Sequence, residues 1–318
     1  MPISYRNIHL IYNPTAGRLQ RSGESAVERL VEILERQGAQ VTPAPTAGPR
    51  DARRLARRAV EENADLVLVA GGDGTINEAL NGLVHSTVPM AAMPLGTANV
   101  LAVELGMAGA PERVAASIPD LVPERVAVGH LRSADQERYF LMMAGAGVDA
   151  HIVAHVDPEL KKRLGKLAYW IGGFTHLGVK FPEFEVLVDG RTLRSCFTLA
   201  ARVRNYGGDL EIAKTACLLD DYFEVVVFEG DYSFRYLKYF TGVLANLLDH
   251  MEGVHICKAK RVEFRPPPEE EVFVQVDGEF AGRLPAVVEL VPSALTLLVP
   301  QAFREKFSEC RDAASGAQ

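Results

Sequence analysis

The sequence predicts an α/β protein of two domains, the first built on a parallel sheet and the second a mainly antiparallel, β-sandwich-like domain. The chain has 318 residues, 48% of them hydrophobic, and chains of this length usually bury two cores. Strand and helix patterns alternate over the first third, which is typical of a parallel sheet covered on both faces. After about residue 125 strand follows strand, which favours antiparallel pairing.

The elements of the first domain follow from hydrophobic periodicity and from the residues that end each run. We expect strands at 8–12, 39–44, 66–70 and 89–93, and helices at 24–38, 51–62 and 76–83. Thr75 and Glu78 have the spacing of a capping box at the start of the last helix. Because parallel strands end at the same edge of a sheet, the turns that follow them should meet there.

The second domain is predicted from apolar runs broken by turn residues. We expect strands within 138–147, 183–203, 222–230 and 271–284, helices at 160–177 and 232–250, and a rigid connector at 265–271. The predicted domains are residues 1–126, with a C-terminal return at about 299–318, and residues 127–298. The last ten residues have the composition of a frayed tail.

Composition excludes several classes of protein. The net charge of −7 gives no basic surface for nucleic acid. The four cysteines have no paired spacing, so neither a disulfide framework nor a zinc site is indicated. No apolar stretch reaches the length of a membrane span. We expect a cytoplasmic protein that can associate peripherally with a membrane surface.

Three glycine-containing turns follow strands of the first domain: NPTAG (13–17), GGDGT (71–75) and PLGTAN (94–99). Glycine lets backbone N–H groups approach an anion closely, and the N-terminus of a following helix favours negative charge. A glycine turn after a strand is also common in α/β folds without any ligand, but three such turns at one edge indicate a polyphosphate site. The turns match neither a Walker loop nor a dinucleotide fingerprint. The partial match GAGVDA (145–150) is interpreted as packing glycine, with Asp149 as a weaker candidate for a functional site.

Asp73 lies within GGDGT, where a phosphate group would meet a negative charge. Carboxylate and phosphate repel each other at close range, so a site that holds both needs magnesium or a network of donors between them. The turn therefore predicts more than a simple anion cradle.

These turns, together with VRNYGGDLEIAKTACLLDDYFEV (203–225) and VDGE (276–279), resemble the diacylglycerol kinase catalytic-domain family, which includes bacterial diacylglycerol kinases, sphingosine kinases and ceramide kinases. GGDGT is also similar to NAD kinases and phosphofructokinases, whereas PLGTAN with a downstream VDGE is more particular to lipid kinases. The resemblance implies a nucleotide-binding first domain and a lipid-binding second domain. It implies transfer of the γ-phosphoryl group of ATP to a hydroxyl of a lipid such as diacylglycerol, with Mg²⁺.

The resemblance also implies the ATP contacts. They fall on the turns and the adjoining helix starts: Asn13, Pro14, Thr15, Ala16, Gly17, Arg18, Thr46, Gly71, Gly72, Asp73, Gly74, Thr75, Asn77, Glu78, Gly96, Thr97 and Asn99.

Transfer to an alcohol needs a carboxylate that accepts the hydroxyl proton. VDGE supplies Asp277 and Glu279, although Asp-Gly between apolar strands is also a hairpin signal, as in VLVDGRTL (186–193). The resemblance implies that one of the two is the general base or a metal-linked partner. Some sphingosine kinase relatives use the aspartate of GGDG, so Asp73 is a third candidate, and the choice stays open.

In bacterial members of the family, an aspartate side chain, backbone carbonyls and waters hold a structural magnesium. The matching groups are Asp220 and the carbonyls of Cys217 and Tyr222, and hard oxygen ligands suit magnesium. The chain departs from the family at Asp221, where glycine is usual, and at Ala127, where aspartate is usual. An acidic turn without metal and a nucleotide-binding regulator without catalysis therefore remain alternatives.

The stretch 160–181 combines basic residues with tyrosine, tryptophan and leucine, which suits an anionic membrane interface, and 232–250 is comparably apolar. Both could equally pack on the β domain. The expected partners are a lipid substrate and, reversibly, a membrane surface. An NAD kinase-like enzyme with a soluble acceptor is the alternative, and a homodimer is among the open oligomeric states.

Overall fold

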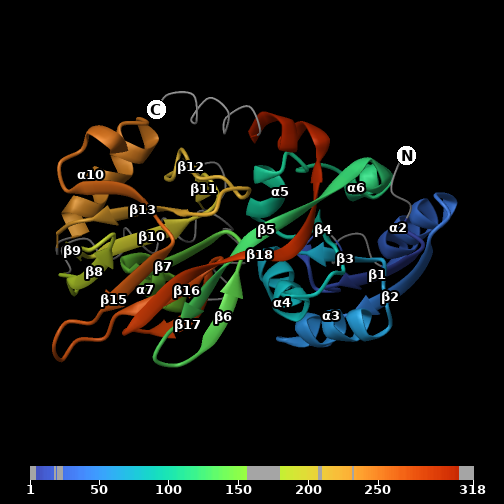
Figure 1. Cartoon of the computed structure of the whole chain (residues 1–318), viewed down its shortest axis with the longest axis horizontal. Helices are drawn as coiled ribbons and strands as arrows, with labels where there is room; N and C mark the ends of the chain where they lie inside the picture. The colour runs from blue at the N-terminus through green and yellow to red at the C-terminus, as the bar shows by residue number, and fades with distance from the viewer. Residues whose placement is uncertain are drawn as a thin grey trace. The chain divides into compact units, whose positions relative to one another are not determined.

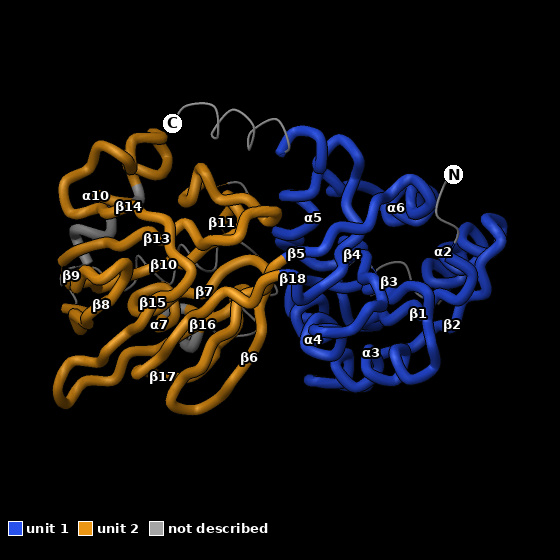
Figure 2. Tube along the Cα trace, viewed as in Figure 1, with its two compact units in different colours: residues 1–126, 293–318 blue, residues 127–292 orange. Residues whose placement is uncertain are grey.

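The computed structural model describes residues 5–17, 19, 24–155, 180–206, 210–230 and 233–307. The chain divides into two compact units: unit 1 is residues 1–126 with 293–318, and unit 2 is residues 127–292 (Figure 2). Of the predicted features, Arg18, the stretch 160–177 and the C-terminal tail lie outside the described residues.

Unit 1 is built on a sheet in the order β2-β1-β3-β4-β18. Four of its strands are parallel neighbours: β1 (Asn7–Tyr12), β2 (Gln40–Pro45), β3 (Leu66–Gly71) and β4 (Met90–Pro94). Every residue of β3 and β4 is buried, as expected of strands covered on both faces. The observed strands agree with the predicted ones to within one residue at each end.

The helices of unit 1 are α2 (Glu24–Arg36), α3 (Asp51–Glu61), α4 (Asp73–Leu83), α5 (Val100–Glu104) and α6 (Pro111–Ser117), followed by the short 3₁₀ helix η1 (Ile118–Asp120). Helices α3 and α4 lie together on one face of the sheet (Figure 1). They approach closely at Gly82, where a Cβ atom would lie 2.5 Å from the carbonyl oxygen of Arg53.

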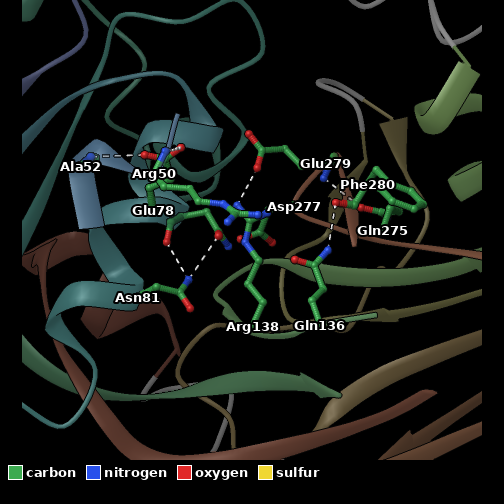
Figure 3. Close-up of polar contacts among 12 residues, drawn as sticks. Arg50, Ala52, Glu78, Asn81, Gln136, Arg138, Gln275, Asp277, Glu279 and Phe280 are labelled. Carbon is green, nitrogen blue, oxygen red and sulfur yellow. Dashed lines mark hydrogen bonds and ion pairs between the residues drawn. The ribbon is translucent and has the colours of Figure 1, made fainter. Parts of the chain in front are cut away.

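Helix α4 begins three residues before the predicted start, at Asp73, with Gly72 as its N-cap. The predicted capping box of Thr75 and Glu78 is therefore wrong. The carboxylate of Glu78 instead accepts hydrogen bonds from the backbone N–H groups of Arg50 (2.7 Å) and Ala52 (3.3 Å), where α3 starts (Figure 3). It stabilises the beginning of another helix, because those N–H groups have no partner within α3 itself.

The chain returns to unit 1 through the last part of β18 (Ala286–Pro300), in which Leu297 pairs with Met90 of β4. Arg125 secures this return. Its guanidinium donates to the carbonyl oxygen of Ser86 (3.0 Å), to the hydroxyl of Thr296 (3.1 Å) and to the carbonyl oxygen of Ser293. A helix over 301–307 follows.

Unit 2 contains two antiparallel sheets. The first has the order β14-β13-β10-β7-β16-β17: β7 (Met143–Gly147), β10 (Phe197–Ala201), β13 (Phe223–Phe228), β14 (Val254–Ala259), β16 (Phe273–Val276) and β17 (Glu279–Arg283). The second contains β5 (Leu121–Arg132), β6 (Glu137–Phe140), β8 (Phe184–Val188), β9 (Arg191–Ser195), β15 (Arg261–Arg265) and the first part of β18. Side chains from both sheets form one buried core that includes Phe140, Phe184, Phe223 and Phe264. The predicted fold class is confirmed.

Smaller elements complete unit 2: α7 (Val148–His155), a two-stranded ribbon of β11 (Asn205–Tyr206) and β12 (Leu210–Glu211), α10 (Ser233–Leu244) and η2 (Leu248–His250). Helix α10 falls within the predicted helical stretch 232–250. In the part of the chain that the structure describes, no helix is both long and apolar enough to cross a membrane.

Two hairpins of unit 2 carry the same Asp-Gly turn. Asp189 and Gly190 have φ values of 49° and 73° and join β8 to β9, with Val188 opposite Arg191. Asp277 and Gly278 have φ values of 49° and 80° and join β16 to β17. Positive φ at both central residues is the geometry of the favoured two-residue hairpin turn, so VDGE is a hairpin turn whatever else it does.

Candidate active site

The parallel strands of unit 1 bring the predicted turns together at their carboxyl ends. The N–H of Asn13 donates to the carbonyl of Ala70 (3.1 Å), and that of Thr46 donates to the carbonyl of Tyr12 (2.9 Å). The N–H of Leu95 donates to the carbonyl of Gly71 (3.0 Å) in the same way. The turns after β1, β2, β3 and β4 are therefore neighbours along one edge.

The NPTAG turn is shaped by Asn13. Its side-chain oxygen accepts from both the N–H and the hydroxyl of Thr15, each at 2.9 Å. Pro14, Thr15 and Gly17 are exposed, whereas Ala16 is buried beneath them. A Cβ atom at Gly17 would meet no described atom within 4 Å, so the backbone here is open to a ligand.

Glycine is required where two of the turns touch. A Cβ atom at Gly96 would lie 2.5 Å from the Cα atom of Gly72, and one at Gly71 would lie 2.7 Å from the Cβ atom of Thr75. Real Cβ atoms do not approach other heavy atoms so closely, so the GGDGT and PLGTAN turns pack backbone against backbone. These glycines therefore have a packing role in addition to any ligand contact.

The carboxylate of Asp73 connects the same two turns. It accepts from the N–H groups of Val100 (3.2 Å) and Leu101 (3.4 Å), at the start of α5. The side chain of Asn99 closes the PLGTAN turn from within: it accepts from the N–H of Gly96 (2.8 Å) and donates to its carbonyl (2.9 Å). Backbone donors thus surround the negative charge that the sequence places in the turn.

Two predicted ATP contacts have their side chains engaged inside the protein. Asn77 is 1% exposed, and its side-chain oxygen accepts from Asn81 (3.3 Å). Glu78 binds the start of α3. Both side chains thus bind groups of the protein itself, and the ATP contacts that the resemblance implies for them stay predictions. Of the other candidates, Gly74 and Thr75 are partly buried in the first turn of α4, and Thr97 is exposed.

In unit 2, Asp277 differs from its counterpart in the other Asp-Gly hairpin. Asp189 is exposed, whereas Asp277 is 8% exposed. The carboxylate of Asp277 accepts from three consecutive N–H groups, those of Leu141 (3.2 Å), Met142 (3.0 Å) and Met143 (3.0 Å). It fixes the loop between β6 and β7.

Glu279 is the more accessible carboxylate of VDGE. Its Oε2 atom lies 2.5 Å from a guanidinium nitrogen of Arg138, and the two side chains are 38% and 17% exposed (Figure 3). Among the residues that the structure describes, Oε1 of Glu279 has no hydrogen-bond partner. This carboxylate combines a fixed orientation with an oxygen that can accept a proton.

Two buried side chains, those of Gln275 and Asp149, support the VDGE hairpin. The side chain of Gln275 donates to the carboxylate of Asp149 (2.8 Å) and accepts from the N–H of Gly278 (2.9 Å). Asp149 is 2% exposed, and this burial raises the pKa of its carboxyl to about 7. Gln275 belongs to no recognised motif. Its role is visible only in the structure, where it pairs with Gly145 of GAGVDA and joins Asp149 to the VDGE hairpin.

The turn predicted to hold a structural magnesium is internally bonded. The N–H of Asp220 donates to the carbonyl of Cys217 (3.1 Å). The hydroxyl of Tyr222 bonds to the carboxylate of Asp220 and accepts from Lys258 (2.8 Å). Burial and the bond to Asp220 raise the pKa of the Tyr222 hydroxyl.

One further group, the guanidinium of Arg202, reaches this turn from the end of β10. Arg202 is not among the predicted site residues, although its position directly after the apolar run FTLAA (197–201) is a signal in the sequence.

Comparisons with known proteins agree with the motifs. The family model described as "Diacylglycerol kinase catalytic domain" matches residues 7–131, and that described as "YegS C-terminal NAD kinase beta sandwich-like domain" matches residues 142–299. The diacylglycerol kinase of Bacillus subtilis (strain 168) is 29% identical over 88% of this chain and 92% of its own length. The diacylglycerol kinase of Mycobacterium tuberculosis (strain CDC 1551 / Oshkosh) is 28% identical over 91% of this chain and 94% of its own length. A solved diacylglycerol kinase structure from Bacillus anthracis str. Sterne has a TM-score of 0.77 at 23% identity and covers 95% of this chain and 99% of its own.

Proposed function

Because the chain belongs to the diacylglycerol kinase catalytic-domain family, we propose that it transfers the γ-phosphoryl group of ATP to a hydroxyl group of a lipid such as diacylglycerol. The relatives that carry the name diacylglycerol kinase support a lipid acceptor. The observation that carries the proposal is the edge of unit 1, where the turns after four parallel strands lie side by side and two of them pack backbone against backbone.

Unit 1 is proposed to bind ATP. The exposed backbone at Gly17 allows phosphate oxygens to come close, and the glycine turns after β3 and β4 lie at the same edge. Asp73 contributes by holding α5 against GGDGT, so that the PLGTAN turn keeps its shape. Magnesium, when bound with the nucleotide, neutralises phosphate charge during transfer.

Glu279 is proposed as the general base. Asp277 already accepts three N–H bonds and Asp73 accepts two, whereas Oε1 of Glu279 has no partner among the described residues. As the acceptor oxygen bonds to the γ-phosphorus, its proton passes to Glu279, the bond to the bridging oxygen breaks and ADP leaves. Arg138 orients the carboxylate, and Asp277 and Gln275 hold the hairpin that carries it.

Association with a membrane surface is a further part of the proposal. Leu244 is 59% exposed at the end of α10, and Leu247, just beyond it, is 53% exposed. Two exposed leucines three residues apart suit the boundary between head groups and acyl chains. Sedimentation with anionic liposomes at low salt should pull down the protein, and Leu244→Ser with Leu247→Ser should weaken this binding more than Ile256→Ser, a change at another exposed apolar residue. An unmodified protein that stays in the supernatant would remove the membrane proposal.

The test of the reaction is incubation of the purified protein with labelled ATP, magnesium and a mixed lipid panel. We expect labelled phospholipid in the organic phase. Label in a water-soluble acceptor instead would support a kinase of the NAD kinase type, and tight ATP binding without any transfer would support a regulator.

A further inference from the structure

The turn that the family resemblance assigns to a structural magnesium already contains a cation. Arg202 follows β10 and is 0% exposed. Its Nη2 atom donates to the carbonyl oxygens of Leu218 and Asp220 (3.2 Å for Asp220), and its Nη1 atom donates to the carbonyl oxygen of Ala127. The guanidinium thus binds backbone oxygens from two separate parts of unit 2.

The charge of this guanidinium is retained in the core. The guanidinium is a cation at neutral pH because arginine side chains stay protonated in proteins. A buried cation is costly unless it has hydrogen-bond acceptors. Here three backbone carbonyls accept from the two Nη atoms, whereas Nε has no partner among the described residues.

Two of the three groups that the resemblance assigns to magnesium already have partners within the protein. Magnesium requires near-octahedral oxygen ligands at about 2.0–2.1 Å. The carboxylate of Asp220 is bonded to the hydroxyl of Tyr222, and the carbonyl of Cys217 accepts the N–H of Asp220. The carbonyls between and beside them bind Arg202. A divalent cation here would also be repelled by the guanidinium, because like charges interact strongly in a protein interior.

Both departures of the sequence from the family pattern involve the same arginine. The carbonyl of Ala127, at a position where aspartate is usual, accepts a hydrogen bond from Arg202. Asp221, at a position where glycine is usual, adds a negative charge that favours the protonated guanidinium. The two changes are thus connected through one side chain.

We propose that the guanidinium of Arg202 takes the place of the structural magnesium in the turn 217–222, so that unit 2 contains its own fixed cation. A magnesium ion and an arginine would have the same role here, because either places a positive charge among the backbone carbonyls and the aspartate of the turn. The arginine does so at any concentration of free metal. This inference does not depend on the lipid acceptor.

The first test measures binding of Mn²⁺, as a paramagnetic substitute for Mg²⁺, to the full chain without nucleotide. Electron paramagnetic resonance should show the same number of bound ions for the unmodified protein and for Asp220→Asn. One bound ion that is lost in Asp220→Asn would overturn the proposal, because it would locate a divalent cation at this turn. This measurement needs no variant of Arg202 to fold.

The second test is thermal unfolding with magnesium and with EDTA. The unmodified protein should have the same Tm in both. Arg202→Gln should lower the Tm by several degrees, and magnesium should raise the Tm of this variant because the carbonyls are freed for another cation. Arg191→Gln, a change at an exposed arginine of β9, is the control. The proposal fails if Arg202→Gln is no less stable than the control, or if magnesium stabilises the unmodified protein and Arg202→Gln equally.

Discussion

Asp277 and Met143 exchange two hydrogen bonds. The N–H of Met143 donates to the carboxylate of Asp277 (3.0 Å), and the N–H of Asp277 donates to the carbonyl of Met143 (3.0 Å). The hairpin that carries Glu279 is therefore held by backbone and side chain together. The orientation of the proposed base depends on a neighbour whose own carboxylate is fully engaged.

Asp277→Asn should destabilise the protein more than Asp189→Asn. Asparagine tolerates positive φ, so both turns keep their geometry and the comparison isolates the carboxylate. The amide introduced at position 277 would face N–H donors with an NH₂ group, and we expect a loss of about 1–3 kcal/mol. The exposed Asp189→Asn should change stability by less than about 0.5 kcal/mol. Urea unfolding measures both, and equal losses would contradict the role assigned to Asp277.

Glu279→Gln should lower kcat by about 10²–10⁴ without a change in Tm comparable to that of Asp277→Asn. Glutamine keeps the shape of the side chain but cannot accept the hydroxyl proton. Glu271→Gln is the matched control, because Glu271 is an exposed carboxylate on the same segment that pairs with Arg283. Retention of near-normal kcat by Glu279→Gln would exclude it as the base.

Two substitutions of Asp73 distinguish positioning from proton transfer. Asparagine retains an oxygen that can accept from Val100 or Leu101, whereas alanine retains none. If Asp73 positions the turn, Asp73→Asn should keep more activity and a lower KM for ATP than Asp73→Ala, with a stability loss for the latter of about 0.5–2 kcal/mol. Equal and severe losses of kcat in both variants would instead indicate that Asp73 takes the proton.

Gly96→Ala should separate the two turns that touch at Gly72. The added methyl group would lie 2.5 Å from backbone, and we expect a cost of about 1–3 kcal/mol together with weaker ATP binding. Gly48→Ala is the control, since a Cβ atom there meets no described atom within 4 Å. Calorimetric titration with ATP and thermal unfolding measure the two effects. A Gly96→Ala variant with unchanged ATP affinity would argue against a cradle at this edge.

The burial of Asp149 predicts a pH dependence of stability. Its folded pKa, about 7, exceeds the value of about 3.9 in unfolded chains. Its stabilising contribution is therefore present below about pH 4 and is lost as the pH rises through about 7, at up to roughly 1.4 kcal/mol per pH unit. Asp149→Asn keeps an acceptor for Gln275 and should remove this slope. Urea unfolding across the range checks it, and parallel curves for the two proteins would contradict the prediction.

The sheet of unit 1 was predictable because its signals are local. The apolar runs of β3 and β4 and the turn residues after them fix both the strands and the edge at which they end. The start of α4 was predicted too late, at residue 76, since Thr75 and Glu78 match a local capping pattern. The actual partners of Glu78 lie at Arg50 and Ala52, and no local pattern contains them.

The two Asp-Gly hairpins show that local sequence does not identify the functional residues either. Their sequences predict the same turn, and their φ values agree. Only the fold decides that Asp277 is buried against Met143 while Asp189 is exposed. The contacts of Arg202 with Ala127 and of Gln275 with Asp149 were not predictable for the same reason, because each joins residues far apart in the sequence.

Leu297 pairs with Met90, and Arg125 holds the returning segment in place. The sheet of unit 1 therefore cannot be completed until the segment that follows unit 2 has been synthesised. Most of unit 1 leaves the ribosome well before the strand that covers β4, because the whole of unit 2 lies between them in the sequence. Until then β4 has an unpaired edge, which is the kind of exposed strand that promotes association between chains. A protein truncated after Pro292 should therefore aggregate during translation, even though every residue of the proposed nucleotide site is present.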